Sequence, residues 1–163
     1  MSSQSLTGSE RRGGPIDTNL LVLLAVGTVD ENFVEQHKRT REYSADDYHL
    51  LCEFVAGHQI IVTPNILTEA SNLLSWRPRK DDARFMLVLQ QFITVFEERY
   101  LASRTASRQA EFTRLGLTDA TIIACAREVS GTITDDLDLY LALNGAGCLV
   151  VNFTHLRVAH GLL

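Results

Sequence analysis

Four acidic residues, Asp17, Glu69, Asp119 and Asp136, are spread through a chain of 163 residues. Each lies near the start of a predicted helix or the end of a predicted strand. Several carboxylates that meet at one point repel each other strongly unless a divalent cation neutralises them. Carboxylate oxygens are hard ligands, and no histidine or cysteine accompanies them to form a zinc motif. The set therefore favours Mg²⁺ or Mn²⁺ over zinc.

Asp119 gives the strongest single signal of the four. On a helix that runs to Glu128, with Thr118 as its expected N-cap, Asp119 shares a face with the apolar residues Ile122 and Ile123. A carboxylate on a buried stripe is costly unless something compensates for its desolvation. A bound metal cation would supply that compensation.

The other acids are open to plainer interpretations. Glu69 lies at the edge of the apolar stripe of its helix, where a glutamate is usually only solvated. Aspartates that follow a strand, such as Asp17, Asp135 and Asp136, commonly cap the next helix. The combination of four positions, rather than any one of them, therefore indicates a metal site.

The elements that position these acids alternate between strand and helix patterns. The apolar segment 19–26 fits a buried strand or a buried helix, and its periodicity does not decide between them. Further strands are predicted over 59–63, 94–96, 131–134 and 148–153, and helices over 45–57, 65–75, 80–92, 118–128 and 136–144. This order predicts a three-layer α/β/α domain with a central parallel sheet, in which ligands bind outside the carboxyl ends of the strands.

The composition indicates one globular domain. Residues 1–14 are polar and predict a disordered tail, and residues 15–163 predict a single domain. Three cysteines without paired spacing argue against a disulfide scaffold and favour a reducing, cytoplasmic location. The first apolar run is too short to cross a bilayer, so we expect no membrane association.

Four short segments, in order along the chain, resemble the signature of the PIN-domain nucleases. They are 16–19 (IDTN), 68–69 (TE), 117–120 (LTDA) and 134–138 (TDDLD). The resemblance spans residues 16 to about 153 and extends to the VapC-type toxins, which cleave RNA and are held silent by an antitoxin. It implies a PIN-like parallel sheet with helices on both faces and a Mg²⁺- or Mn²⁺-dependent phosphodiesterase centre.

The resemblance also assigns roles to residues. It implies a catalytic quartet that consists of Asp17, Glu69, Asp119 and Asp136. Three of these, Asp17, Asp119 and Asp136, would be the metal ligands. The supporting polar groups would be Asn19, Thr134 and Asp138. Asp135 competes with Asp136 for the fourth place. The family pattern of a threonine, one variable residue and then the acid favours Asp136.

The chain departs from the family pattern in two places. Only Ile16 remains of the hydrophobic strand that normally precedes the first aspartate, so we expect a short or irregular first strand. The segment 29–47 is long and charged compared with that of the compact toxins.

The reaction that the resemblance implies is hydrolysis of RNA phosphodiester bonds by a metal-activated water, which would leave a 5′-phosphate and a 3′-hydroxyl. Basic residues in several segments are candidate phosphate contacts. The preferred cluster, which follows the Glu69 helix, consists of Arg77, Arg79, Lys80 and Arg84, and further candidates are Arg99, Arg104, Arg108 and Arg114.

The formal charge of −5 argues at first sight against a nucleic-acid partner. The acids in and around the expected site contribute −6, however, so the formal charge of the rest of the chain is +1. These six acids are Asp17, Glu69, Asp119, Asp135, Asp136 and Asp138. A catalytically weak PIN-like binding or scaffold module and a DNA-directed nuclease stay open as alternatives. The expected partners are RNA, an antitoxin if the chain is the toxin of a type II pair, and a second copy of the chain, because apolar positions on several helices permit a homodimer.

Overall fold

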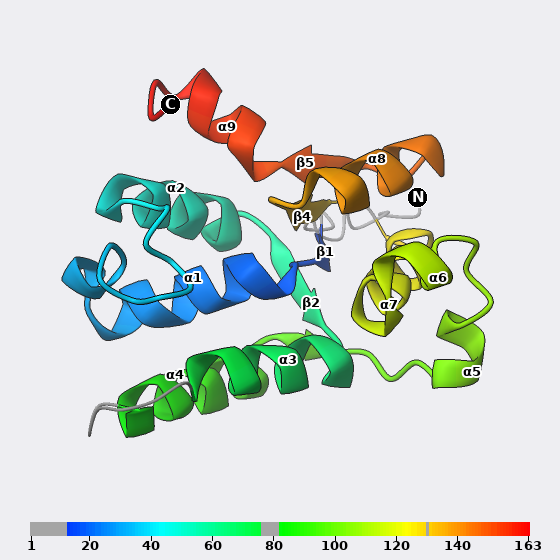
Figure 1. Cartoon of the computed structure of the whole chain (residues 1–163), viewed down its shortest axis with the longest axis horizontal. Coiled ribbons are helices and arrows are strands. Elements are labelled where there is room, and N and C mark those ends of the chain that lie inside the picture. The colour runs from blue at the N-terminus through cyan, green and yellow to red at the C-terminus, as the bar shows by residue number, and fades with distance from the viewer. Residues whose placement is uncertain (1–12, 76–81, 130) are drawn as a thin grey trace, which may run out of the picture.

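The computed structural model describes residues 13–75, 82–129 and 131–163, which fold around short parallel strands (Figure 1). The strands are β1 (Gly13–Pro15), β2 (Gln59–Val62), β3 (Glu97–Glu98), β4 (Thr132–Thr134) and β5 (Val150–Asn152). The helices are α1 (Thr18–Val29), α2 (Ala45–Ala56), α3 (Pro64–Leu74), α4 (Asp82–Val95), α5 (Ser103–Ala106), α6 (Phe112–Leu115), α7 (Leu117–Ala126), α8 (Leu137–Gly145) and α9 (Phe153–Ala159), with a 3-10 helix at Glu31–Phe33.

Every strand pair in the described chain is parallel. Strands β1, β2 and β3 form one sheet and β4 and β5 a second. A parallel bridge between Ile16 and Ile133 joins the two sheets, so the strands follow one another in space as β3-β2-β1-β4-β5. Gly14 permits this junction, because a Cβ atom there would lie 2.6 Å from the backbone nitrogen of Thr132.

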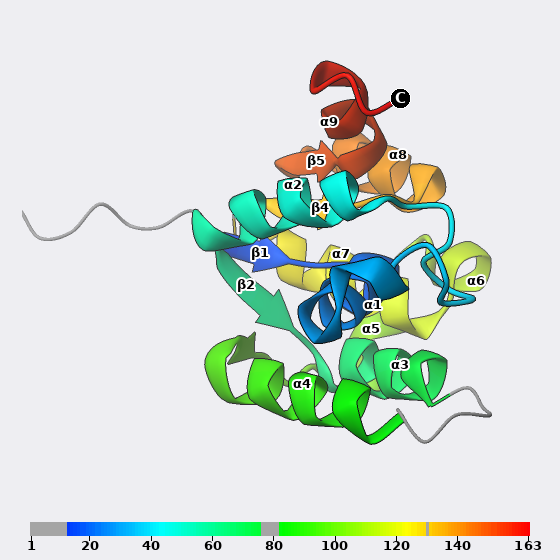
Figure 2. The same ribbon diagram turned by 90° about the vertical axis from the view of Figure 1, so that its left-hand side faces the viewer.

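Helices cover both faces of these strands. Figure 1 shows α1 and α2 on one side and α7 on the other, and the turned view in Figure 2 agrees. The apolar segment that fits either a strand or a helix forms α1. Every residue from Leu20 to Val26 is buried, since α2, α3 and α4 all pack against this helix. A helix that is covered all round has no polar face, and its sequence therefore lacks the 3.6-residue period.

Strand β1 is the point at which the strand order reverses. The chain leaves β1 through α1 and α2 and reaches β2 on one side of it, whereas β4, which follows α7, lies on the other side. In parallel α/β sheets the crevice at such a reversal, outside the carboxyl ends of the strands, is the usual place for a ligand. Asp17 directly follows β1 and its bridge residue Ile16, and Asp136 lies two residues beyond β4.

The predicted α/β architecture with a parallel sheet is confirmed, and one strand was placed wrongly. The backbone N–H of Phe96 donates to the carbonyl of Phe92 at 2.8 Å, so helical hydrogen bonding continues through the predicted strand 94–96. The strand in this part of the chain is β3, which pairs with the end of β2.

The start of the sheet also differs from the prediction. Strand β1 begins at Gly13, so two residues of the predicted tail 1–14 belong to the sheet, and residues 1–12 lie outside the described chain. The expected short first strand is confirmed. No helix within the described ranges is both long and apolar enough to cross a membrane.

The close approach at Gly14 predicts a specific stability defect. In Gly14→Ala the added methyl group meets backbone atoms of Gly131 and Thr132 that cannot move without breaking the β1–β4 junction. We expect a loss of about 2 kcal/mol in the free energy of unfolding, measured by urea denaturation. Gly145→Ala is the matched control, because nothing lies within 4 Å of a Cβ there. Equal stabilities of the two variants would contradict the close contact.

Candidate active site

Asp17 is the structural centre of the acidic residues. It is 4% exposed and is the N-cap of α1, where its Oδ1 accepts the N–H of Leu20 at 2.8 Å. Its Oδ2 accepts the hydroxyl of Thr134 at 2.5 Å and the backbone N–H of Asp135 at 2.7 Å. Burial raises the pKa of Asp17, and the three hydrogen bonds lower it by a smaller amount. One carboxylate thus joins the ends of β1 and β4 to the start of α1.

Asp136 lies at the neighbouring strand end. Its Oδ1 accepts the N–H of Leu139 at 2.9 Å, so it is the N-cap of α8, and its side chain is exposed. The backbone N–H of Asp136 donates to the Thr134 hydroxyl at 3.0 Å, while that hydroxyl donates to Asp17. The plain interpretation as helix caps is therefore true for both aspartates, and a single hydroxyl connects them.

Asp119 approaches this pair from the first turn of α7. Its pKa is raised to about 7, first by burial and then by the negative charges of Asp136, Asp17 and Glu69. All three other members of the predicted quartet thus lie close enough to repel its ionised form. The structure brings the four acids into one electrostatic group, although they come from four separate segments of the chain.

The predicted N-cap of this helix is wrong. Helix α7 begins at Leu117, directly after Gly116, whose φ of +89° is the left-handed conformation that glycine tolerates. Thr118 therefore lies inside the first turn, and its carbonyl accepts the hydroxyl of Thr121 at 2.6 Å. The consequence for the site is small, because Asp119 stays near the positive end of the helix dipole.

Glu69 is exposed on α3, beside a groove of about 400 Å³. The groove runs between α3 and the start of α7, and its wall includes both Glu69 and Thr118, the residue before Asp119. The residues that line it are Pro64, Asn65, Thr68, Glu69, Asn72, Leu117 and Thr118. Five of these seven residues have polar side chains, so the groove can admit a hydrated ligand next to Glu69.

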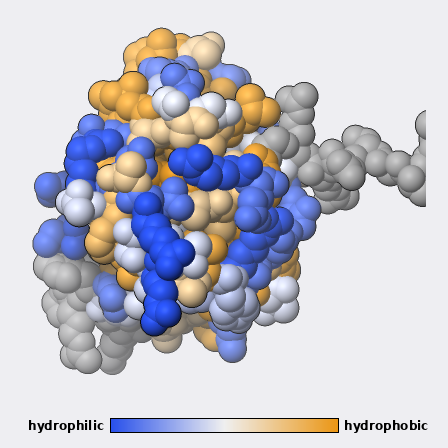
Figure 3. All heavy atoms as spheres, turned by 90° about the vertical axis from the view of Figure 1, so that its right-hand side faces the viewer, coloured by the Kyte–Doolittle hydropathy of each residue, from blue (hydrophilic) through white to orange (hydrophobic). Residues whose placement is uncertain are grey.

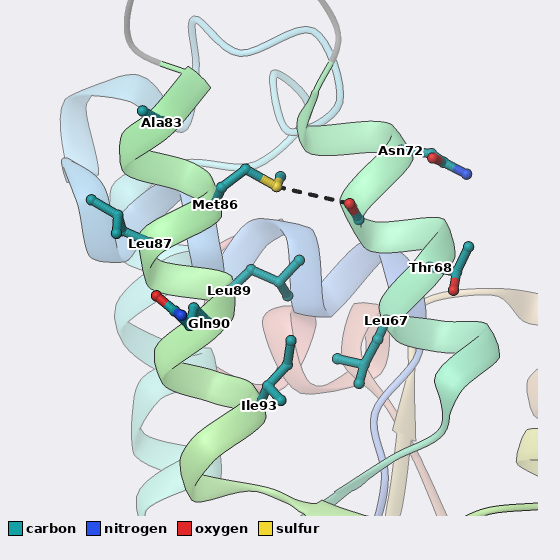
Figure 4. A pocket seen from close by; sticks show the side chains of 10 residues that line it. Leu67, Thr68, Asn72, Ala83, Met86, Leu87, Leu89, Gln90 and Ile93 are labelled. Carbon is teal, nitrogen blue, oxygen red and sulfur yellow. Dashed lines mark hydrogen bonds between the residues drawn. The ribbon is translucent and has the colours of Figure 1, made fainter.

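A larger groove of about 730 Å³ lies between α3 and α4 (Figure 4). Leu67, Leu89 and Ile93 project into it, and Ser71 donates to the sulfur of Met86 across it at 3.8 Å. None of the described residues that line it carries a charge. Of the two grooves, only the one beside Glu69 has a member of the predicted quartet in its described lining.

Asp135, next to Asp136, helps to raise the pKa of Asp17 by its charge, but its own side chain is bonded to other partners. Its Oδ2 accepts the hydroxyl of Tyr43 at 2.6 Å, and its Oδ1 accepts the hydroxyl of Thr154. Both oxygens are thereby occupied by the protein. Sequence reasoning missed Tyr43 and Thr154, and no local signal could have found them, because Tyr43 is 92 positions away from Asp135.

The three residues predicted as supporting groups have different surroundings. Thr134 is fully buried between Asp17 and Asp136. Asn19 is exposed in the first turn of α1. Asp138 is exposed in the first turn of α8, where the guanidinium of Arg114 lies 3.5 Å from its carboxylate. Only Thr134 therefore contacts the predicted quartet directly in the described chain.

Most of the predicted nucleic-acid cluster cannot be placed. Arg77, Arg79 and Lys80 lie outside the described residues, and Arg84 is exposed on α4 with its guanidinium 5.3 Å from the centre of the Phe33 ring. Figure 3, which views the side that carries α5 and α6, shows elongated hydrophilic side chains across the middle of that face. Three arginines are exposed in this part of the chain: Arg104, Arg108 and Arg114.

The predicted ligands Asp17, Asp119 and Asp136 would offer carboxylate oxygens, the donors that a hard divalent cation prefers. Within the described ranges, no three acidic, histidine or cysteine side chains are already gathered as closely as metal ligands. Exposed Asp136 and Glu69 have the room to turn toward a cation.

In comparisons with protein-family models, curated proteins and solved structures, nothing matches the chain. The functional argument therefore depends on the geometry of the acids and their surroundings.

The raised pKa of Asp119 predicts how stability depends on pH in metal-free solution. A carboxyl whose pKa rises from 3.8 to about 7 on folding stabilises the fold below pH 4, and this contribution is lost as the pH rises toward 7. Asp119→Asn cannot ionise, so we expect the variant to gain roughly 1–3 kcal/mol over the wild type between pH 4 and pH 8, after allowance for solvent screening.

Urea denaturation in EDTA at several pH values measures this difference. Asp46→Asn is the control, because Asp46 is exposed on α2 and its charge is not among the causes of the raised pKa of Asp119. Parallel pH profiles of the wild type and Asp119→Asn would show that the four charges do not interact.

Proposed function

We propose that the chain is a Mg²⁺- or Mn²⁺-dependent nuclease of the PIN type that hydrolyses RNA phosphodiester bonds. The observation that carries the proposal is the raised pKa of Asp119, which burial and the charges of Asp136, Asp17 and Glu69 produce together. A protein gains no stability from four acids that repel one another at the carboxyl edge of a sheet. A site that binds a cation explains why they are together.

In the proposed mechanism, Asp17, Asp119 and Asp136 hold the cation and Glu69 orients the attacking water. The bound cation supplies a water of lowered pKa and stabilises negative charge on the phosphate in the transition state. Asp17 is the fixed member, because Thr134 and the Asp135 N–H orient its carboxylate. Glu69 is exposed beside the polar groove, where it can accept a proton from water that enters with the substrate.

The substrate in this proposal is a polymer rather than a small phosphoester. Exposed arginines occur on α4 and around α5 and α6, on separate segments of the chain. A single small phosphate would need only one such cluster, whereas a strand contacts several. RNA as the preferred polymer, an antitoxin partner, a homodimer and a cytoplasmic location all derive from the sequence and its PIN resemblance, and stay predictions.

A nuclease assay with matched variants tests the proposal. Labelled single-stranded RNA and DNA are incubated with the protein in Mg²⁺, Mn²⁺ or EDTA. We expect RNA cleavage that EDTA abolishes and that Asp17→Asn and Asp119→Asn each reduce at least about 100-fold, beyond the loss typical of residues that only support a metal ligand. Asp46→Asn should retain wild-type activity.

Three outcomes would contradict parts of the proposal. Undiminished cleavage in EDTA or in both variants would exclude the metal–carboxylate mechanism. Preferential cleavage of DNA would favour the DNA-directed alternative. An inert wild-type protein that still binds nucleic acid would favour the binding or scaffold module.

A further inference from the structure

A chain of buried and half-buried contacts connects the C-terminal helix and the segment before α2 to the acidic site. The backbone N–H of Asp135 holds Oδ2 of Asp17 at 2.7 Å, so the orientation of the peptide between residues 134 and 135 sets the position of that oxygen. The Asp135 side chain is itself fixed by two hydroxyls, from Tyr43 before α2 and from Thr154 in α9.

Tyr43 is held as firmly as the group that it contacts. It is 3% exposed, and its ring packs beside that of Phe153, with the centres 6.3 Å apart. The guanidinium of Arg157 lies over the Tyr43 ring, 5.2 Å from its centre. Since the ring is fixed by its neighbours, its hydroxyl has little freedom to leave the Asp135 carboxylate.

Arg157 is in turn locked by a buried ion pair. Its Nε and one terminal nitrogen donate to the two carboxylate oxygens of Asp47 at 2.7 and 2.9 Å, and the same terminal nitrogen reaches the carbonyl of Glu42 at 3.3 Å. Asp47 also forms the capping box of α2 with Ser44. A bidentate arginine–carboxylate pair is among the most directional contacts in proteins. The start of α2 and helix α9 are thus fixed to each other next to Asp135.

A carboxylate is a costly choice at position 135 unless its charge has a use. It lies close enough to Asp17 to raise the pKa of that acid, so it opposes the ionised state that a metal ligand needs. A neutral residue would offer the same backbone N–H without this repulsion. What the carboxylate adds is two strong acceptors, which bind hydroxyls from two distant segments.

We propose that Tyr43 and Thr154 are positioning residues of the acidic site: by clamping the Asp135 carboxylate, they fix the backbone N–H that orients Asp17. The inference rests on the proposed function, because it takes Asp17 to be a metal ligand. It assigns Asp135 to the clamp and leaves Asp136 as the fourth acid of the quartet. Helix α9 and the segment before α2 would then help to position the metal ligand Asp17.

The test measures Mn²⁺ binding by titration calorimetry and, separately, the melting temperature. The variants Tyr43→Phe and Thr154→Val each remove one hydroxyl with little change of shape. We expect each to raise the Kd for Mn²⁺ roughly 10-fold, as supporting residues of metal sites do. The Mn²⁺ concentration for half-maximal RNA cleavage should rise by the same factor, with the rate at saturating Mn²⁺ within about threefold of wild type.

Thr40→Val is the matched control for a purely structural effect. The Thr40 hydroxyl is buried in the same segment and donates to the carbonyl of Val34 at 2.7 Å, away from Asp135. We expect this variant to melt at a lower temperature but to bind Mn²⁺ with the wild-type Kd. Asp135→Asn should keep measurable Mn²⁺ binding, whereas Asp17→Asn should abolish it.

The outcomes separate this inference from the proposed function. If the wild type binds Mn²⁺ and Asp17→Asn does not, while Tyr43→Phe and Thr154→Val behave like Thr40→Val, the clamp is structural only and the inference is wrong. Abolished Mn²⁺ binding in Asp135→Asn would make Asp135 a ligand and also overturn it. A wild-type protein that binds no Mn²⁺ would overturn the proposed function, and the inference with it.

Discussion

The buried carboxylate of Asp17 is the contact on which the rest of the structure depends. Strand β1 has only three residues and could not by itself align the two halves of the sheet. Asp17 receives donors from the first turn of α1 and from the end of β4, so one side chain fixes where the central helix begins and where the second sheet joins the first. The Thr134 hydroxyl extends this alignment to Asp136 and to the start of α8.

Burial of Asp17 and Asp119 lowers the stability of the fold at a pH at which both are ionised. A carboxylate with three hydrogen-bond donors would ordinarily have a lowered pKa, yet burial raises that of Asp17 and also that of Asp119. The folded protein therefore carries acids that resist ionisation, and the proposed cation would relieve this cost by balancing their charge. The same desolvation that weakens the metal-free fold would strengthen cation binding, because fewer water molecules compete with and screen the interaction.

Much of the fold could be predicted because its signals are local. Strand β2 follows from a β-branched run that Pro64 ends, and helix α3 follows from the helical spacing of its apolar residues. The ambiguity over α1 arose because burial on all sides removes periodicity, and only the packing of α2, α3 and α4 around it decides. The acids could be proposed because each stands at a predicted junction. The Tyr43 contact with Asp135 and the Arg157 contact with Asp47 span 92 and 110 residues, and no pattern in the sequence encodes them.

The PIN resemblance favours Asp136 over Asp135 as the fourth acid, and the structure shows that the two neighbouring side chains have different surroundings. Successive side chains at the end of a strand point in different directions, so neighbouring aspartates enter different surroundings. The two carboxylate oxygens of Asp135 accept hydrogen bonds from the hydroxyls of Tyr43 and Thr154. One oxygen of Asp136 caps α8 by accepting the N–H of Leu139. The Asp136 side chain is exposed, and its charge helps to raise the pKa of Asp119. Among the described residues, one oxygen of Asp136 accepts no hydrogen bond, whereas each oxygen of Asp135 accepts one, so Asp136 is the more accessible of the two acids.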